Sequence, residues 1–62
     1  MQRHEAVQYL IVNNIDPVSD ALIAYRDLLN AGFVITGSKD DRVNEWESLV
    51  DEYKRIGNDN SI

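Results

Sequence analysis

Apolar residues recur at helical spacing in three stretches of this chain. In the first stretch, positions 2–13, they occupy i, i+1, i+4 and i+5, the pattern of one helix face. These residues are Ala6, Val7, Leu10 and Ile11. Asn13 and Asn14 suit the end of such a helix, because Asn tolerates the left-handed conformation that helix ends often require. We therefore predict a first helix over this stretch.

The second stretch opens with a helix start signal, Asp16-Pro17. The Asp16 carboxylate can accept hydrogen bonds from the free N–H groups of a first turn, and Pro17 at the first helical position gives up no bond. We predict a helix from Pro17 to about Ala31, with Gly32 just past its end. Its predicted buried stripe is Val18, Ala21, Leu22, Tyr25, Leu28 and Leu29.

The third stretch opens with a variant capping box, in which Ser38 caps the helix and Asp41 reaches back. The helix is predicted to run to about Ile56, with Gly57 closing it. Its predicted buried stripe is Val43, Trp46, Leu49, Val50, Tyr53 and Ile56.

Between the second and third helices lies an apolar segment of another kind, Phe33-Val34-Ile35-Thr36. Its β-branched and aromatic residues between two glycines favour a short strand. A lone strand leaves backbone groups unpaired, so an extended linker is the alternative. The predicted fold is all-α: a small three-helix domain over residues 1–57, with an extended or strand segment at 33–36 and a flexible C-terminal tail at 58–62.

Composition narrows the classes of protein to consider. The chain has 62 residues, a formal charge of −5, one histidine and no cysteine. That length allows one small domain of marginal stability, for which self-association is a common remedy. The lack of cysteine excludes a disulfide framework and thiolate metal sites. No apolar run approaches the ~18 residues of a membrane span, and no signal-peptide pattern opens the chain, so we expect a cytoplasmic protein.

Motifs for chemistry are weak. The run from Gly32 to Lys39 resembles a phosphate-binding loop only in part, because Ser38 and Lys39 stand in the reverse of the required order. His4 lies beside Glu5, but there is no second histidine for a zinc pair. We predict no catalytic residue, no cofactor, no metal and no enzymatic activity.

Carboxylates form the more informative set on the third predicted helix. Several stand at i, i+4 spacing with the same sign, which costs a few tenths of a kcal/mol per pair. They form either a solvated face that keeps the domain in solution or an acidic docking face for a basic partner. The candidate acidic interaction residues are Asp41, Glu45, Glu47, Asp51 and Glu52.

An apolar surplus remains outside the predicted stripes. A three-helix monomer would leave these side chains partly in water, and a contiguous group of them would form a contact surface. The candidate apolar interaction residues are Tyr9, Val12, Ile23, Phe33 and Ile35.

The leading functional hypothesis is a small acidic, non-enzymatic protein-interaction module, homodimeric and regulatory, adaptor-like or inhibitory, as a bacterial or phage regulator would be. Its protein partner is not identified by the sequence. One alternative is an acidic DNA mimic or anti-repressor-type inhibitor that occupies a basic nucleic-acid-binding site. A helix-turn-helix DNA binder is the other, but acidic residues open the second and third helices and no cationic stripe exists, so no direct nucleic-acid binding is expected.

Overall fold

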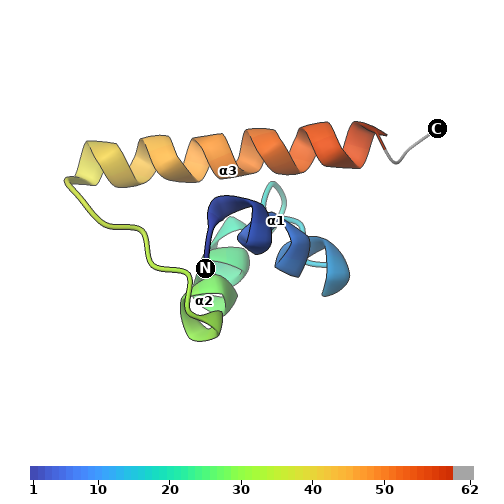
Figure 1. The fold of residues 1–62 in the computed structure, drawn as a ribbon, viewed down its shortest axis with the longest axis horizontal. Helices are drawn as coiled ribbons and strands as arrows, with labels where there is room; N and C mark the ends of the chain where they lie inside the picture. The colour runs from blue at the N-terminus through green and yellow to red at the C-terminus, as the bar shows by residue number, and fades with distance from the viewer. Residues whose placement is uncertain (60–62) are drawn as a thin grey trace.

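The computed structural model describes residues 1–59, which form three helices and no strand: α1 (Arg3–Val12), α2 (Ala21–Ala31) and α3 (Lys39–Asp59) (Figure 1). The predicted all-α fold of three helices is confirmed. The long helix α3 runs along one side of the molecule, with α1 and α2 on the other (Figure 1). α1 packs against both other helices, whereas no Cα atom of α2 lies within 8 Å of a Cα atom of α3 over the described residues.

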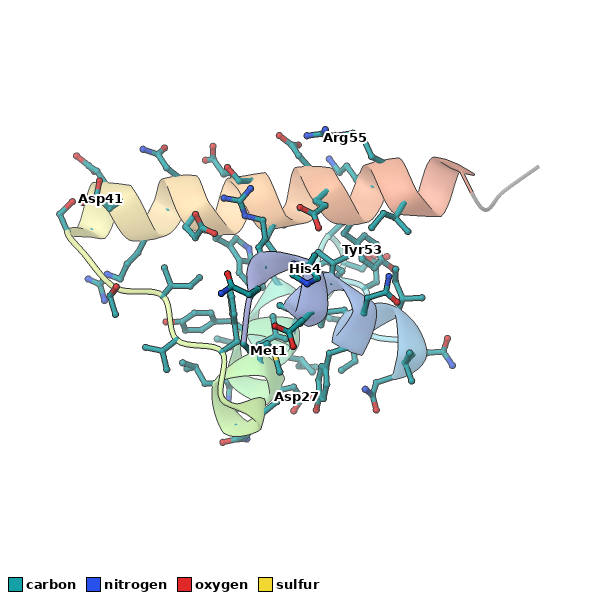
Figure 2. All side chains as sticks on the ribbon, in the orientation of Figure 1. Met1, His4, Asp27, Asp41, Tyr53 and Arg55 are labelled. Carbon is teal, nitrogen blue, oxygen red and sulfur yellow. The ribbon has the colours of Figure 1, made fainter. Side chains whose placement is uncertain are left out.

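The hydrophobic core draws on every segment, with α1 at its centre. Its buried residues are Ala6, Val7, Leu10, Ala24, Leu28, Phe33, Ile35 and Leu49. Leu49 is the one buried residue of α3 among those whose burial is described, and half-buried side chains extend its contact along the helix. Figure 2 shows Tyr53 pointing from α3 toward α1, whereas Arg55 projects from the opposite side of the helix.

α1 ends as its sequence predicts. Asn13 follows the last residue of α1, and its side-chain amide donates from Nδ2 to the Tyr9 carbonyl oxygen at 2.8 Å. Asn14 then takes a positive φ of 57°. Asn accepts this left-handed conformation at lower cost than most residues, so the pair of asparagines turns the chain toward α2.

The predicted start of the second helix was wrong. Asp16 does accept hydrogen bonds from the Val18 backbone N–H at 2.8 Å and the Ser19 hydroxyl at 3.1 Å. The turn that it holds stops at Asp20, whose φ of −124° and ψ of 57° are not helical, and α2 begins at Ala21. Asp is among the residues most favoured at the N-cap, and the chain offers two of them four residues apart. The helix starts from the second.

The buried face of α2 also differs from the predicted stripe. Ala24 and Leu28 are fully buried, whereas Val18 and Leu22 remain 54% and 69% exposed. At 100° per residue, Leu22 lies roughly 120° from Leu28 around the helix axis. Val18 and Leu22, which the sequence assigned to the core, therefore face solvent.

Extended backbone, with no strand pairing among the described residues, connects α2 to α3. Gly32 takes a left-handed φ of 105° at the end of α2, and the Phe33 N–H donates to the Leu28 carbonyl oxygen at 2.8 Å. Phe33 and Ile35 then point into the core, with 5% and 8% exposure, while Val34 between them is 64% exposed. Burial of alternate side chains anchors the segment in place of a partner strand.

The start of α3 is confirmed and its end is not where the sequence placed it. The Ser38 N–H donates to Asp41 Oδ2 at 3.3 Å, and the Asp41 N–H donates to Ser38 Oγ at 3.2 Å, which completes the capping box. Gly57 does not close the helix, which continues to Asp59. Glycine inside a helix costs about 1 kcal/mol but does not stop it. Of the predicted tail at 58–62, two residues belong to α3 and residues 60–62 lie outside the described part of the chain.

Candidate protein-interaction surface

An apolar groove of about 500 Å³ lies between the first half of α2 and the first half of α3. It exists because α1 packs against both helices while their backbones stay apart. Side chains from α2, α3 and the connection line it; we call it the α2/α3 groove, and its members are Ala21, Leu22, Tyr25, Ile35, Lys39, Arg42, Val43, Trp46 and Glu47. Most of this surface is carbon, so the groove is suited to apolar side chains rather than to a polar substrate.

Two aromatic rings bridge the gap that the backbones leave. The ring centroids of Tyr25 and Trp46 are 5.7 Å apart, and the planes meet at 89°, an edge-to-face contact. Both side chains are half-buried and pack against the core. Ile35 is almost fully buried beside them. These three residues form a firm apolar floor.

The walls and rim of the groove are exposed. Leu22 on the α2 side is 69% exposed and Val43 on the α3 side is 48% exposed. Lys39 and Arg42 stand on the α3 rim, and neither nitrogen-bearing group lies within 4.0 Å of a carboxylate among the side chains of residues 1–57. The groove thus combines exposed apolar side chains with two cations and one carboxylate, that of Glu47, on a chain whose net charge is −5.

The apolar residues proposed from the sequence do not form this surface. Phe33 and Ile35 are buried in the core, and Tyr9 is half-buried against it. Val12 and Ile23 are exposed, at 75% and 54%, but neither lines the α2/α3 groove. The prediction that Phe33 and Ile35 lie free for a partner is corrected, because the extended segment packs them inward.

Leu22, Val43 and Trp46 were missed as groove residues because helical spacing placed them on the predicted core stripes. The only sequence signal that could have found them was a general one: the chain carries more large apolar residues than three short helices can bury. That surplus does not indicate which of the apolar residues are exposed.

The acidic candidates lie on two separate edges of α3. Asp41, Glu45 and Glu52 share the edge that faces the N-terminus of α1, and at 100° per residue Glu47 and Asp51 lie roughly 80–160° away from them. Asp41 is engaged in the capping box. The predicted acidic face is therefore not one continuous surface.

Glu45 has a structural partner. Arg3 of α1 donates to it twice, from Nε to Oε1 at 2.9 Å and from Nη2 to Oε2 at 3.0 Å. The hydrogen bond from the guanidinium lowers the pKa of Glu45 and the same bond raises the pKa of Arg3. Both side chains are more than a third exposed, so the pair contributes modestly to stability. It joins the start of α1 to α3.

An open polar hollow of about 760 Å³ adjoins this ion pair, between the N-terminus, residues 33–36 and α3. His4, Glu45 and Glu52 are among its lining residues. Over the described residues, however, no three His, Cys, Asp or Glu side chains come close enough to hold a metal ion. Its carboxylate Glu45 is already paired with Arg3.

None of the helices, as far as the chain is described, combines the length and the apolar character needed to cross a bilayer. No protein-family model matches the chain, and neither a curated protein nor a solved structure is significantly similar to it.

Proposed function

We propose that this protein is a non-enzymatic protein-interaction module, acting as a regulator, adaptor or inhibitor through the α2/α3 groove. The observation that carries the proposal is the groove itself, an apolar floor with exposed Leu22 and Val43 as walls and unpaired cations at the rim. An apolar centre with a polar rim is the usual anatomy of a protein–protein contact. Grooves between helices are also a common receptor for an amphipathic helix.

The distribution of charge favours this proposal over the nucleic-acid alternatives. A DNA mimic needs a continuous array of carboxylates, but Asp41 is engaged in a cap, Glu45 is paired, and Glu47 and Asp51 lie on another edge. A helix-turn-helix protein joins its two helices by a turn of about 3–4 residues. Here seven residues, 32–38, connect α2 and α3, and Asp40 and Asp41 lie in the first turn of the candidate recognition helix.

The test is capture from a lysate of the source cells on three immobilised proteins: wild type, Val43→Glu and Ile23→Glu. Val43→Glu places a charge on the groove wall, whereas Ile23→Glu is the matched change at an exposed apolar position outside the groove. We expect wild type and Ile23→Glu to retain a protein that Val43→Glu loses. Circular dichroism of each variant checks that it is folded.

A titration with the captured protein, once purified, completes the test. Trp46 is the single tryptophan of the chain and lies on the groove floor, so occupation should shift its fluorescence to shorter wavelength. The fluorescence of the captured protein in the same buffer is subtracted. Identical captured sets for all three proteins, together with an unchanged Trp46 spectrum, would overturn the proposal.

A further inference from the structure

We infer that the α2/α3 groove receives a second copy of this chain, through the segment 16–22 that borders the groove. The inference rests on the proposed function and names the partner. In the resulting dimer, Val18 and Leu22 of each protomer lie on the groove floor of the other, and Asp20 meets the cationic rim. The contact is apolar at its centre and ionic at its edge.

The segment 16–22, which we call the donor segment, presents two exposed apolar side chains and is already ordered. Val18 and Leu22 are 54% and 69% exposed, so both can lose surface to a partner. Asp16 holds the turn through its bonds to the Val18 N–H and the Ser19 hydroxyl. A segment fixed in this way pays little further conformational entropy on binding, which raises affinity without new contacts.

The negative charge of Asp20 favours the donor segment as the part of the second copy that enters the groove. Among the side chains of residues 1–57, Lys39 and Arg42 have no carboxylate within 4.0 Å. With Glu47 they are the charged residues that line the groove, so its lining carries a net positive charge on a negative chain. Asp20 is exposed, and its side chain makes no cap hydrogen bond, so its carboxylate is free to meet a cation. Such complementarity between apolar contacts fixes the register of a protein–protein contact.

The donor segment lies next to the groove of its own chain, and this position explains why the assembly closes as a dimer. Leu22 is both the wall of the groove and the end of the donor segment, so donor and acceptor lie on one face. A two-fold axis beside Leu22 then makes both contacts at once, and no further copy can add. A standard interface takes about 800 Å² from each partner, roughly a fifth of the 4411 Å² surface of one chain. Two of the large apolar side chains left exposed, Leu22 and Val43, lie in the groove, and Val18 lies four residues before Leu22.

Sedimentation equilibrium on the full chain tests the inference. At ~100 µM, far above a low-micromolar Kd, the mass should approach twice the 7.1 kDa of one chain. Leu22→Glu puts a charge on the groove wall and in the donor segment. Lys39→Glu reverses a rim charge in the first turn of α3, where the helix dipole favours an acid and folding is retained. Each variant should raise the dimer Kd at least about tenfold.

Two matched variants act as controls. Ile23→Glu repeats the apolar-to-acid change on α2 outside the groove, and Lys54→Glu repeats the charge reversal on the distal half of α3. Both should leave the Kd within about twofold of wild type. Asp20→Asn completes the set, because Asn keeps the N-cap preference while removing the charge, and it should weaken the dimer as Lys39→Glu does.

Two results would overturn the inference. The first is a mass of 7.1 kDa for wild type at ~100 µM. The second is a dimer that Leu22→Glu and Lys39→Glu leave intact, which would place the contact elsewhere. Either result leaves the proposed function standing if Val43→Glu still loses a captured protein, since the groove would then take a different partner. Loss of the captured protein's dependence on Val43 would instead refute the proposed function.

Discussion

The ring contact between Tyr25 and Trp46 is the most direct test of how α2 and α3 are joined. No Cα atoms of the described parts of these helices lie within 8 Å of each other, so the edge-to-face contact, with ring centroids 5.7 Å apart, is a principal link between them. Aromatic pairs of this geometry contribute about 0.5–1.5 kcal/mol beyond the area that they bury. We predict a coupling free energy of that size in a double-mutant cycle.

The cycle uses Tyr25→Leu, Trp46→Leu and the double variant, because leucine keeps part of the apolar contact with the core. A fully buried large aromatic costs about 3–5 kcal/mol on truncation to alanine. These two side chains are only half-buried and retain a leucine, so about 1–2 kcal/mol per single change is expected on the same basis. Domains of this length have a total stability of about 3–9 kcal/mol. The double variant therefore sits near the limit of folding.

Urea unfolding followed by far-UV circular dichroism gives the four free energies, since Trp46 fluorescence is lost in two of the proteins. All four are measured in one concentration of trimethylamine N-oxide, which strengthens burial and keeps the double variant folded at the start. A single protein concentration is used because self-association would shift the apparent stability. Equal m-values confirm that the unfolded states are comparable. A coupling below about 0.3–0.5 kcal/mol, the usual scatter of additivity, would refute the contact and with it the floor of the groove.

Four further predictions concern other parts of the fold. Above pH 4.5, the unfolded reference value, the lowered pKa of Glu45 adds stability through Arg3, and this is lost as pH falls toward the folded-state pKa. The free energy of unfolding measured in urea should be up to about 1 kcal/mol higher for wild type than for Glu45→Gln at neutral pH. The two values should converge in acid. Gly57→Ala should stabilise the domain by about 0.5–1 kcal/mol, because Gly57 is helical with open space around it. Gly37→Ala should destabilise it by more than about 1 kcal/mol, because φ is +112° and Asp41 Cβ would lie 3.0 Å from the new methyl group; thermal melts that reversed this order would contradict both assignments. A gel shift with duplex DNA at submicromolar protein and ~150 mM salt should show no complex, since the net charge repels phosphate.

The sequence predicts the parts of this fold that depend on a few neighbouring residues. Ser38 and Asp41 form their capping box, Asn14 takes the left-handed turn after α1, and Gly32 does so after α2. Each signal works because the hydrogen bonds or the φ angle involved lie within one turn of the chain. The number of helices follows from these boundaries.

The start of α2 could not be predicted in the same way. Asp16 and Asp20 are both good N-cap residues, and local propensity does not choose between them. Packing of the whole chain decides, and it buries Pro17 in the first turn while α2 begins afresh at Ala21. With α2 beginning at Ala21, its buried residues are Ala24 and Leu28. The sequence alone therefore did not show that Leu22 would be exposed.

The α2/α3 groove could not be predicted from the sequence, for a related reason. Whether Leu22 and Val43 are core or surface depends on the distance between two helices, not on the spacing within either of them. Phe33 and Ile35 show the reverse error, because an alternating segment can bury one side in its own domain without any partner strand. Helical spacing finds apolar faces, but only the packed structure shows which of them remain uncovered.

The position of α1 explains why an uncovered face exists at all. α1 supplies three fully buried residues and packs against both α2 and α3, so it holds these helices apart as a wedge would. Two aromatic rings then span the gap at its floor, but none of the residues that the structure describes fills the space above them. A tighter bundle would cover Leu22 and Val43 and gain their burial, at about 1.5–3 kcal/mol for each side chain. The groove is thus a consequence of three-helix packing around a central helix, and a partner that fills it recovers the burial that the single chain cannot make.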